Sequence, residues 1–233
     1  MITLYDLGPS TTGGGYSHNV RRIVYALKYK KIPFTISLVD FLTLEPTAKS
    51  VGASPTSKKA NGDPQYTVPF IRDSTTGKVV SDSLVIAEYL DETYPDTPRV
   101  VPPGTRALQA AYSDWAVDKL FQILPFLEPR MHDIGSPEVK ESYKALYGVP
   151  TRPPDEEKAA VWDKVQQAFD SVKAGHGEVY VTGDKPIFAD FALAGLLWEI
   201  SLGIGNDSEE WKEIAGWQDG RLGRLLESVE KYV

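Results

Sequence analysis

The first part of the chain alternates between two hydrophobic periods. Residues 2–5 and 34–39 switch between apolar and polar side chains, as half-buried strands do. Between these runs, four apolar residues recur at helical spacing: Val20, Ile23, Val24 and Leu27. The basic residues within 21–31 lie off this stripe, which is typical of the solvated side of a helix. Strand, helix and strand together predict a βαβ unit with two parallel strands.

The next stretch contains the signals of a hairpin and a helix. Residues 42–65 carry several Pro and Gly breakers and predict a surface segment with room for one short helix. Residues 68–71 and 78–81 predict two strands joined by a turn. Asp82 and Ser83 then cap a helix with an apolar stripe, and the pattern ends near Pro95. We therefore expect an α/β domain over residues 1–95.

The rest of the chain has helical periods only. After the stiff linker Pro102-Pro103-Gly104, one long helix is predicted, with a kink near Pro125. Its expected inward face contains Leu108, Ala111, Tyr112, Trp115 and Lys119. Helices are also predicted from residue 155, over 188–202, where the segment is apolar nearly all round, and around 222–229. Residues 133–154 form an insertion of no clear pattern. An all-helical domain is expected over residues 105–233.

Composition excludes several classes of protein. The chain has 233 residues, 42% of them hydrophobic, and a net charge of −7, which disfavours nucleic acid and anionic membranes as partners. It has no cysteine, so it offers no disulfide, no Cys-ligated metal and no protein thiol, as in a reducing cytoplasmic compartment. Its three histidines are widely separated, and we expect no metal site. Neither a secretory signal nor a membrane span is predicted.

Candidate chemistry gathers where a glycine-rich loop meets the first helix. Ser17 occupies the position of a helix N-cap, directly after Gly13-Gly14-Gly15 and Tyr16. A strand, a flexible loop and a helix N-terminus in this order present backbone N–H groups and a positive dipole end to an anion. The alternative is that Ser17 is only a cap. The loop matches neither GxGxxG nor a P-loop.

The order of elements resembles a thioredoxin-like fold, and more specifically the N-terminal domain of a glutathione transferase. The matching pieces are Ser17, Val68-Pro69, the junction Ser81-Asp82-Ser83 and the helix at 85–91. With the helical half, the chain resembles the whole transferase architecture, α/β followed by all-α. Further pieces are similar to the fungal etherase-related FuA class and to bacterial β-etherases: Arg22, residues 25–28 and residues 186–191.

The resemblance implies that glutathione is the co-substrate and that Ser17 stabilises its thiolate. Asn19 could assist the same sulfur through its amide, or simply face solvent in the first helical turn. Tyr16 is a third candidate, through its phenol. Such a serine would donate a hydrogen bond and need not lose its proton.

The resemblance also assigns the rest of the glutathione site. If the Val68–Pro69 bond is cis, the Val68 backbone can pair with the cysteinyl part of glutathione. Ser83 and the helix N-terminus would receive the γ-glutamyl carboxylate, with Asp82 near the ammonium, although both residues could be helix caps only. Lys58 or Lys59 could meet the glycyl carboxylate.

A hydrophobic electrophile pocket is expected between the domains. Tyr16, Tyr112 and Trp115 are its candidates, although aromatic residues on a helix stripe are commonly core. One departure from the family concerns Asp190, because the Ser or Thr expected three residues before it is Ile187. The cap of that helix must then be built in another way.

These observations lead to two hypotheses. The first is a glutathione transferase acting on hydrophobic aromatic electrophiles in detoxification, or on lignin- or polyphenol-related compounds, with etherase or peroxidase side activity. The alternative is a ligandin that carries polyphenols or flavonoids in the cleft. A thiol reductase of the omega kind would need a cysteine. The resemblance further implies a homodimer.

Overall fold

The computed structural model describes the whole chain except residues 12, 132–133, 149–152, 173–174 and 176–177. It divides into two compact units. The first contains Met1–Val100 and Gly135–Gly148, and the second contains Val101–Ile134 and Val149–Val233. The segment Gly135–Gly148 was expected in the helical domain, so the structure assigns part of the insertion to the other unit.

A four-stranded mixed sheet forms the centre of the first unit. Its strands, in the order β2-β1-β5-β6, are β2 (Phe34–Val39), β1 (Ile2–Leu7), β5 (Phe70–Asp73) and β6 (Val79–Ser81). β1 and β2 are parallel, and β5 is antiparallel to both β1 and β6, so the predicted βαβ unit and hairpin are confirmed. β5 begins at Phe70 and not at Val68, because Pro69 has no N–H for the ladder.

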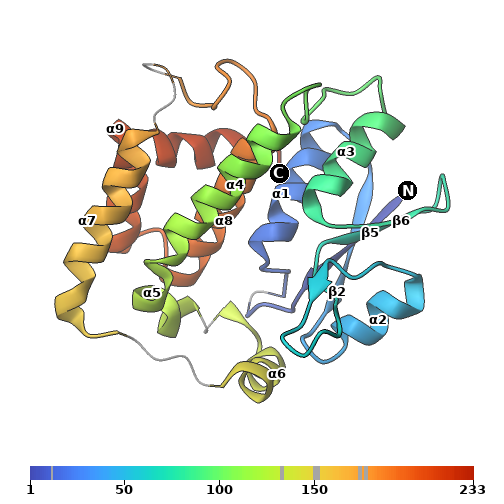
Figure 1. Cartoon of the computed structure of the whole chain (residues 1–233), viewed down its shortest axis with the longest axis horizontal. Coiled ribbons are helices and arrows are strands. Elements are labelled where there is room, and N and C mark those ends of the chain that lie inside the picture. The colour runs from blue at the N-terminus through green and yellow to red at the C-terminus, as the bar shows by residue number, and fades with distance from the viewer. Residues whose placement is uncertain (12, 132–133, 149–152, 173–174, 176–177) are drawn as a thin grey trace. The chain divides into compact units, whose positions relative to one another are not determined.

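Four helices and a small β-ribbon complete the described part of the first unit. They are α1 (His18–Tyr29), α2 (Leu44–Val51), α3 (Ser83–Thr93) and α6 (Pro137–Tyr147), with a small ribbon of β3 (Ser57–Lys58) and β4 (Pro64–Gln65). α1 and α3 pack side by side (Figure 1). The predicted stripe of α1 is buried, with Val20, Ile23 and Leu27 fully inaccessible.

Two basic residues of α1 and its end contradict the prediction of a solvated face. Arg22 is 6% exposed and Lys30 is 2% exposed. The Lys30 Nζ atom lies 2.6 Å from Asp91 Oδ1 on α3 and donates to the Pro98 carbonyl at 2.9 Å. Long basic side chains can bury their stems and carry the charge to a distant partner, which a periodicity argument does not detect.

The second unit contains helices only, among the residues that the structure describes. They are α4 (Arg106–Phe121), α5 (Leu124–Met131), α7 (Asp155–Ser171), α8 (Phe188–Ile204) and α9 (Glu209–Glu230). α8 is the predicted buried helix and contacts α4, α5 and α9. α9 is kinked at residues 217–220, where Gln218 and Asp219 have positive φ.

The predicted inward face of α4 is wrong by one residue. Leu108 is 73% exposed, whereas the buried residues are Gln109, Ser113, Ala116 and Leu120. Gln109 enters the core because its Oε1 atom accepts the Ala189 N–H of α8 at 3.0 Å. A polar residue satisfied in this way shifts the buried face away from the apolar stripe.

Pro125 does not kink a continuous helix. α4 ends at Phe121, and Pro125 lies in the first turn of α5, where its missing N–H has no helical partner to lose. Within the described part of the chain, no helix combines the length and the apolarity that crossing a membrane requires.

Candidate functional site

Ser17 is the N-cap residue of α1, as predicted. Its backbone is extended, and its carbonyl accepts the N–H groups of Val20 at 3.0 Å and Arg21 at 2.9 Å. Its side chain makes no capping hydrogen bond and is almost buried, with 6% of the residue exposed. The hydroxyl of Ser17 is therefore not used as a helix cap.

Asp6 fixes the loop that leads to Ser17. This carboxylate ends the buried part of β1, is 5% exposed, and accepts the Ser17 N–H at 3.3 Å. A Cβ at Gly15 would lie only 1.9 Å from Asp6 Oδ2, so the loop can pass over the carboxylate only as glycine. Sequence reasoning missed Asp6; the available signal was an acidic residue at the end of an apolar strand, just before the loop.

The insertion also holds this loop. The Ser136 N–H donates to the Pro9 carbonyl at 3.0 Å, and Ser10 forms an antiparallel bridge with Gly135. Farther along α6, the Tyr143 ring meets Phe41 edge-on at 5.5 Å. The half-buried Tyr16 closes the loop by donating its N–H to the Leu7 carbonyl at 3.1 Å. The loop before Ser17 is thus tied to segments at both of its ends.

The second part of the predicted site lies at the start of α3. Asp82 has a φ of 77°, and its carboxylate accepts the Leu84 N–H at 2.9 Å and the Val85 N–H at 3.2 Å. Ser83 is 8% exposed, and its Oγ atom accepts from Arg22 Nη1 at 3.5 Å. Asp82 is therefore the N-cap of α3, and Ser83 is its first residue. The cap hydrogen bonds of Asp82 go to Leu84 and Val85 and not to the Ser83 N–H.

Arg22 connects the two parts. It follows Ser17 by five positions on α1, about 7.5 Å along a helix axis, and its guanidinium touches Ser83. The α1–α3 packing therefore places the Ser17 end of one helix and the Ser83 end of the other near a common buried arginine. Helical periodicity predicted a solvent-facing Arg22, and the contact with Ser83 contradicts that prediction.

The other residues predicted to contact glutathione differ in exposure and in the interactions that they already make. The Val68–Pro69 peptide bond is cis. Asn19 is half-buried in the first turn of α1. Lys58 is exposed, whereas Lys59 pairs with Glu45 at 2.8 Å. Hydrogen bonds from Lys49 and Lys59 lower the pKa of Glu45 to about 2.

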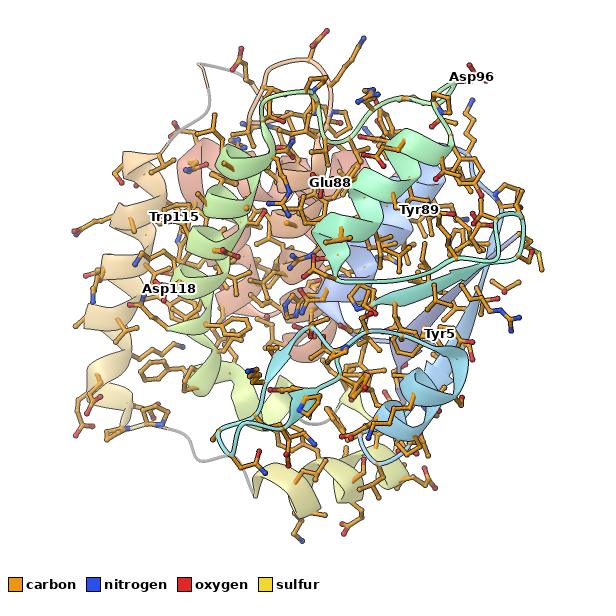
Figure 2. All side chains as sticks on the ribbon, turned by 45° about the vertical axis from the view of Figure 1, so that its right-hand side comes forward. Tyr5, Glu88, Tyr89, Asp96, Trp115 and Asp118 are labelled. Atoms are coloured by element: carbon orange, nitrogen blue, oxygen red, sulfur yellow. The ribbon has the colours of Figure 1, made fainter. Side chains whose placement is uncertain are left out.

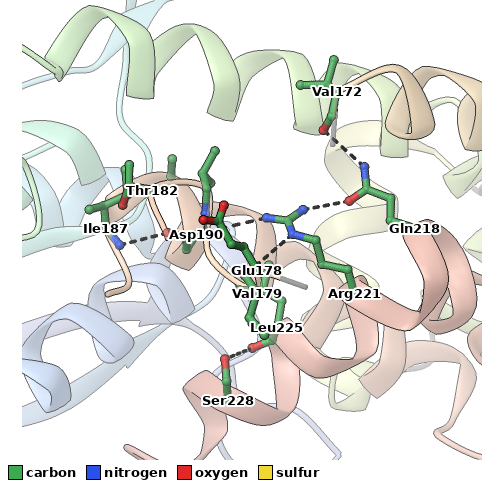
Figure 3. A network of polar contacts seen from close by, with 12 residues as sticks. Val172, Glu178, Val179, Thr182, Ile187, Asp190, Gln218, Arg221, Leu225 and Ser228 are labelled. Carbon is green, nitrogen blue, oxygen red and sulfur yellow. Dashed lines mark hydrogen bonds and ion pairs between the residues drawn. The ribbon is translucent and has the colours of Figure 1, made fainter. Parts of the chain in front are cut away.

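The helical unit contains its own buried polar network (Figure 3). Asp190 accepts the Ile187 N–H at 3.0 Å and the Val181 N–H at 2.9 Å, and Arg221 Nη2 lies 4.0 Å from it. Burial raises the pKa of Asp190 to about 6, against the backbone hydrogen bonds and Arg221, which lower it. The Ile187 N–H thus forms the carboxylate half of a capping box with Asp190, and the Val181 N–H is a second donor to the same carboxylate.

Tyr112 and Trp115 are half-buried and contact other aromatic rings of the helical unit. Trp115 lies on α4 (Figure 2). Its ring centroid is 4.9 Å from that of Phe169 on α7 and 5.6 Å from that of Tyr112. Burial raises the pKa of Tyr112, opposed by Arg221, which forms a hydrogen bond with its hydroxyl. These contacts are those of a core cluster, and a role of the two rings in binding an electrophile stays a prediction.

Comparisons with known proteins identify the family. Residues 16–93 match the glutathione S-transferase N-terminal domain, and residues 107–232 match the glutathione S-transferase C-terminal domain. A glutathione S-transferase-like protein of Aspergillus flavus, ustS, is 31% identical over 239 residues, covering 92% of this chain and 83% of the relative. This chain therefore belongs to the glutathione S-transferase family.

The chain is also similar to solved structures of fungal glutathione transferases. A glutathione S-transferase of Ceriporiopsis subvermispora in complex with glutathione is 33% identical, with a TM-score of 0.87 over 99% of this chain and 97% of that one. Glutathione transferase GSTFuA3 of Phanerochaete chrysosporium is 28% identical, with a TM-score of 0.88 over 100% of this chain and 97% of that one. The predicted family and fold are confirmed, including the likeness to the FuA class.

The described residues contain no group of three or more His, Asp or Glu side chains that could hold a metal ion.

Proposed function

We propose that this protein is a glutathione transferase in which Ser17 stabilises the glutathione thiolate for attack on hydrophobic aromatic electrophiles. The observation that carries the proposal is the Ser17 hydroxyl, which lies at the N-terminal end of α1 without capping it. Membership of the family, and a relative solved with glutathione bound, supply the co-substrate.

Ser17 and the N-terminus of α1 could together supply the free energy needed to stabilise the glutathione thiolate. A free thiol has a pKa of about 8.5, and lowering it by about two units requires about 2.7 kcal/mol. A hydrogen bond to a charged acceptor contributes about 1.5–3 kcal/mol, and a helix N-terminus about 0.3–1 kcal/mol. Ser17 would donate the hydrogen bond, α1 would supply the dipole, and Asn19 is a second possible donor.

The remainder of glutathione would lie along the first unit. The Val68 backbone, beside Pro69, would pair with the cysteinyl residue, and Ser83 with the start of α3 would hold the γ-glutamyl carboxylate. Asp82 would lie near the ammonium group. In a substitution reaction, a sulfur–carbon bond forms, the leaving group departs with its electron pair, and the thiol proton passes to solvent. With an isothiocyanate, the sulfur adds to the carbon, the C=N π pair moves to nitrogen, and nitrogen takes up a proton.

The electrophile is proposed as an aromatic compound of the lignin or polyphenol type, on the strength of the FuA-class likeness. Glutathione-dependent ether cleavage or peroxide reduction would be side activities. A homodimer and detoxification belong to the same proposal. If the protein instead serves as a ligandin, its aromatic compounds bind without turnover.

Two single variants test the role of Ser17. Ser17→Ala should lower kcat/KM for glutathione conjugation of an aromatic isothiocyanate by about tenfold or more, and should raise the pH at which the bound thiol ionises. Asn19→Ala should have a smaller effect if the serine is the main donor. Measuring the thiolate absorbance of bound glutathione against pH separates a change in ionisation from a change in binding.

The ligandin alternative predicts a different result. Turnover would be equally low in the native protein and in Ser17→Ala, while a flavonoid would bind both saturably at micromolar concentration. That outcome would contradict the proposed activity.

A further inference from the structure

An exposed turn closes the ribbon of β3 and β4 in the first unit, and this turn contains the dipeptide Asn61-Gly62. Each strand of the ribbon is only two residues long. A two-stranded ribbon of this length is marginally stable, so its turn opens at a low free-energy cost. Every residue from 57 to 64 is exposed to solvent, and water therefore reaches the whole turn.

Asp63 fixes both ends of the Asn61 side-chain amide. The Asn61 Oδ1 atom accepts the Asp63 N–H at 3.1 Å, and the Asn61 Nδ2 atom donates to Asp63 Oδ2 at 2.8 Å. When a nucleophile adds to Asn61 Cγ, negative charge develops on Oδ1, and the Asp63 N–H already points at that oxygen. The turn therefore holds this amide in one orientation and stabilises the charge that addition to it creates.

The backbone nitrogen of Gly62 is the nucleophile nearest to this amide along the chain. Its attack on Asn61 Cγ closes a five-membered imide ring, and the two reacting groups belong to adjacent residues. Gly62 has no side chain to hinder the approach, and even a Cβ at this position would meet nothing within 4 Å. The Gly62 N–H donates to the Lys59 carbonyl at 2.8 Å, and this bond, which has to break first, belongs to the same exposed turn.

We propose that Asn61 is a site of spontaneous covalent modification, at which the Gly62 nitrogen displaces ammonia from the side chain and the resulting imide takes up water. The Gly62 proton passes to a base in the solvent, the nitrogen–Cγ bond forms, and the Cγ–Nδ2 bond breaks as Nδ2 takes up a proton and leaves as ammonia. Water then opens the imide at Cγ to give aspartate, or at the backbone carbonyl to give isoaspartate. One water is consumed, one ammonia is released, and nothing is oxidised or reduced.

The modification changes the charge and the contacts of the turn, independently of the proposed function. A neutral amide becomes a carboxylate, so the net charge becomes one unit more negative than its present −7. The hydrogen bond from Asn61 Nδ2 to Asp63 is lost, and two carboxylates then lie two residues apart. Lys59, whose Nζ atom lies 2.8 Å from Glu45 on α2, gains a second acidic neighbour. The tie between this turn and α2 is therefore the contact most exposed to the change.

The test follows each asparagine of the full-length protein during incubation at mildly alkaline pH in water enriched in heavy oxygen. Peptide mass spectrometry measures the label taken up, and an isoaspartate-specific methyltransferase measures isoaspartate. Asn206 is the internal control, since it is also exposed but is followed by Asp207. Asn61 should react at least about tenfold faster than Asn206, and Gly62→Ala should lower the rate at Asn61 about tenfold or more, because a β-carbon hinders the attacking nitrogen.

Asn61→Gln is the matched variant, because it keeps an amide but cannot close the five-membered ring, and residue 61 should then take up no label. The same incubation in guanidinium separates the effect of the turn from that of the dipeptide. The rate at Asn61 in the native protein should be at least as high as in the unfolded chain. A lower rate in the native protein, or equal labelling of Asn61 and Asn206, overturns the inference. Asn61→Asp should elute together with the aspartate form of the incubated protein on anion exchange, and separate elution would also contradict it.

Discussion

Gly15 leaves the space in which the Asp6 carboxylate holds the backbone of Ser17. An alanine side chain there would meet Asp6 Oδ2 at 1.9 Å, and Asp6 is too short and too buried to move aside. The loop must shift instead, and the Ser17 hydroxyl with it. The geometry of the proposed thiolate site is therefore sensitive to a single methyl group.

Gly15→Ala should lower kcat/KM for glutathione conjugation by about tenfold or more, because displacements of about 1 Å at a reacting centre have such effects. Gly14→Ala is the matched control, since its Cβ would have nothing within 4 Å and should change kcat/KM by less than about twofold. Steady-state kinetics of the two variants, with melting temperatures, provide the comparison. Equal kinetics would contradict the role given to Asp6.

The raised pKa of Asp190 predicts that the stability of the protein depends on pH. Burial raises its pKa from 3.8 to about 6, so between these two pH values the folded protein holds a proton that the unfolded chain has lost. The associated stability is fully present below pH 3.8 and is lost as the pH rises through about 6. Between about pH 5 and pH 7 the native protein should lose about 1 kcal/mol of unfolding free energy that Asp190→Asn does not lose.

Urea denaturation at several pH values measures this difference. The five tryptophans all lie between residues 115 and 217 and report on the helical unit that contains Asp190. Parallel pH profiles for the two proteins would show that Asp190 stays ionised in the folded state, with Arg221 as the dominant influence.

At the scale of elements, one buried ion pair joins the end of α1 to α3. Lys30 and Asp91 have side chains 0% and 3% exposed, and Asp91 also accepts the Val100 N–H at 3.1 Å. Breaking such a pair leaves a charge without compensation in the interior. The packing of α1 against α3 therefore depends on both residues.

Lys30→Met should lower the free energy of unfolding by about 3–5 kcal/mol, whereas Lys212→Met, which removes the exposed pair Lys212–Glu209, should have little measurable effect. Chemical denaturation followed by circular dichroism measures both. The double variant Lys30→Met with Asp91→Leu should recover part of the loss, because it removes both charges together. If Lys30→Met lowers the free energy of unfolding no more than Lys212→Met does, the buried Lys30–Asp91 pair is not needed for the packing of α1 against α3.

Hydrophobic periods predicted most of the elements but not the places where charge is buried. The stripe of α1, the hairpin and the central helix α8 follow directly from apolar spacing, as the buried Val20 and Leu27 illustrate. Arg22 and Lys30 did not follow, because each contacts a residue 61 positions away, Ser83 and Asp91 respectively. Local pattern contains no information about such partners.

The residues of the candidate site were also predicted only in part from the sequence. Ser17, Asp82 and Ser83 were located because helix starts have recognisable sequences, and the structure places all three at those starts. Asp6 was missed because its partners, Gly15 and the Ser17 N–H, come together only when the loop folds back over β1.

At the scale of the whole molecule, the first unit is not a continuous stretch of sequence. α6 returns to it from beyond residue 134 and contributes the Ser136–Pro9 hydrogen bond and the Phe41–Tyr143 ring contact. A chain limited to residues 1–100 would lack both interactions. Its glycine-rich loop would lose the segment that pairs with it.

A fragment of residues 1–100 should therefore be less stable than the same fragment joined by a flexible linker to residues 135–148. The expected difference is about 1–3 kcal/mol, the sum of an aromatic pair and a few hydrogen bonds. Urea titrations followed by far-ultraviolet circular dichroism measure it, and Tyr143→Ala in the linked fragment should remove part of the gain. Equal stabilities would show that α6 contributes nothing to the unit.

Because the first unit consists of two separate segments of the chain, a chimera of this protein with a relative has to be designed around both segments. The chain passes from one unit to the other after Val100, after Ile134 and after Gly148. A chimera spliced at a single point near residue 100 would inherit α6 from the donor of the helices, although α6 belongs with the loop beside Ser17. Parents that differ in residues 135–148 would need a second crossover, so that α6 and the glycine-rich loop come from the same parent.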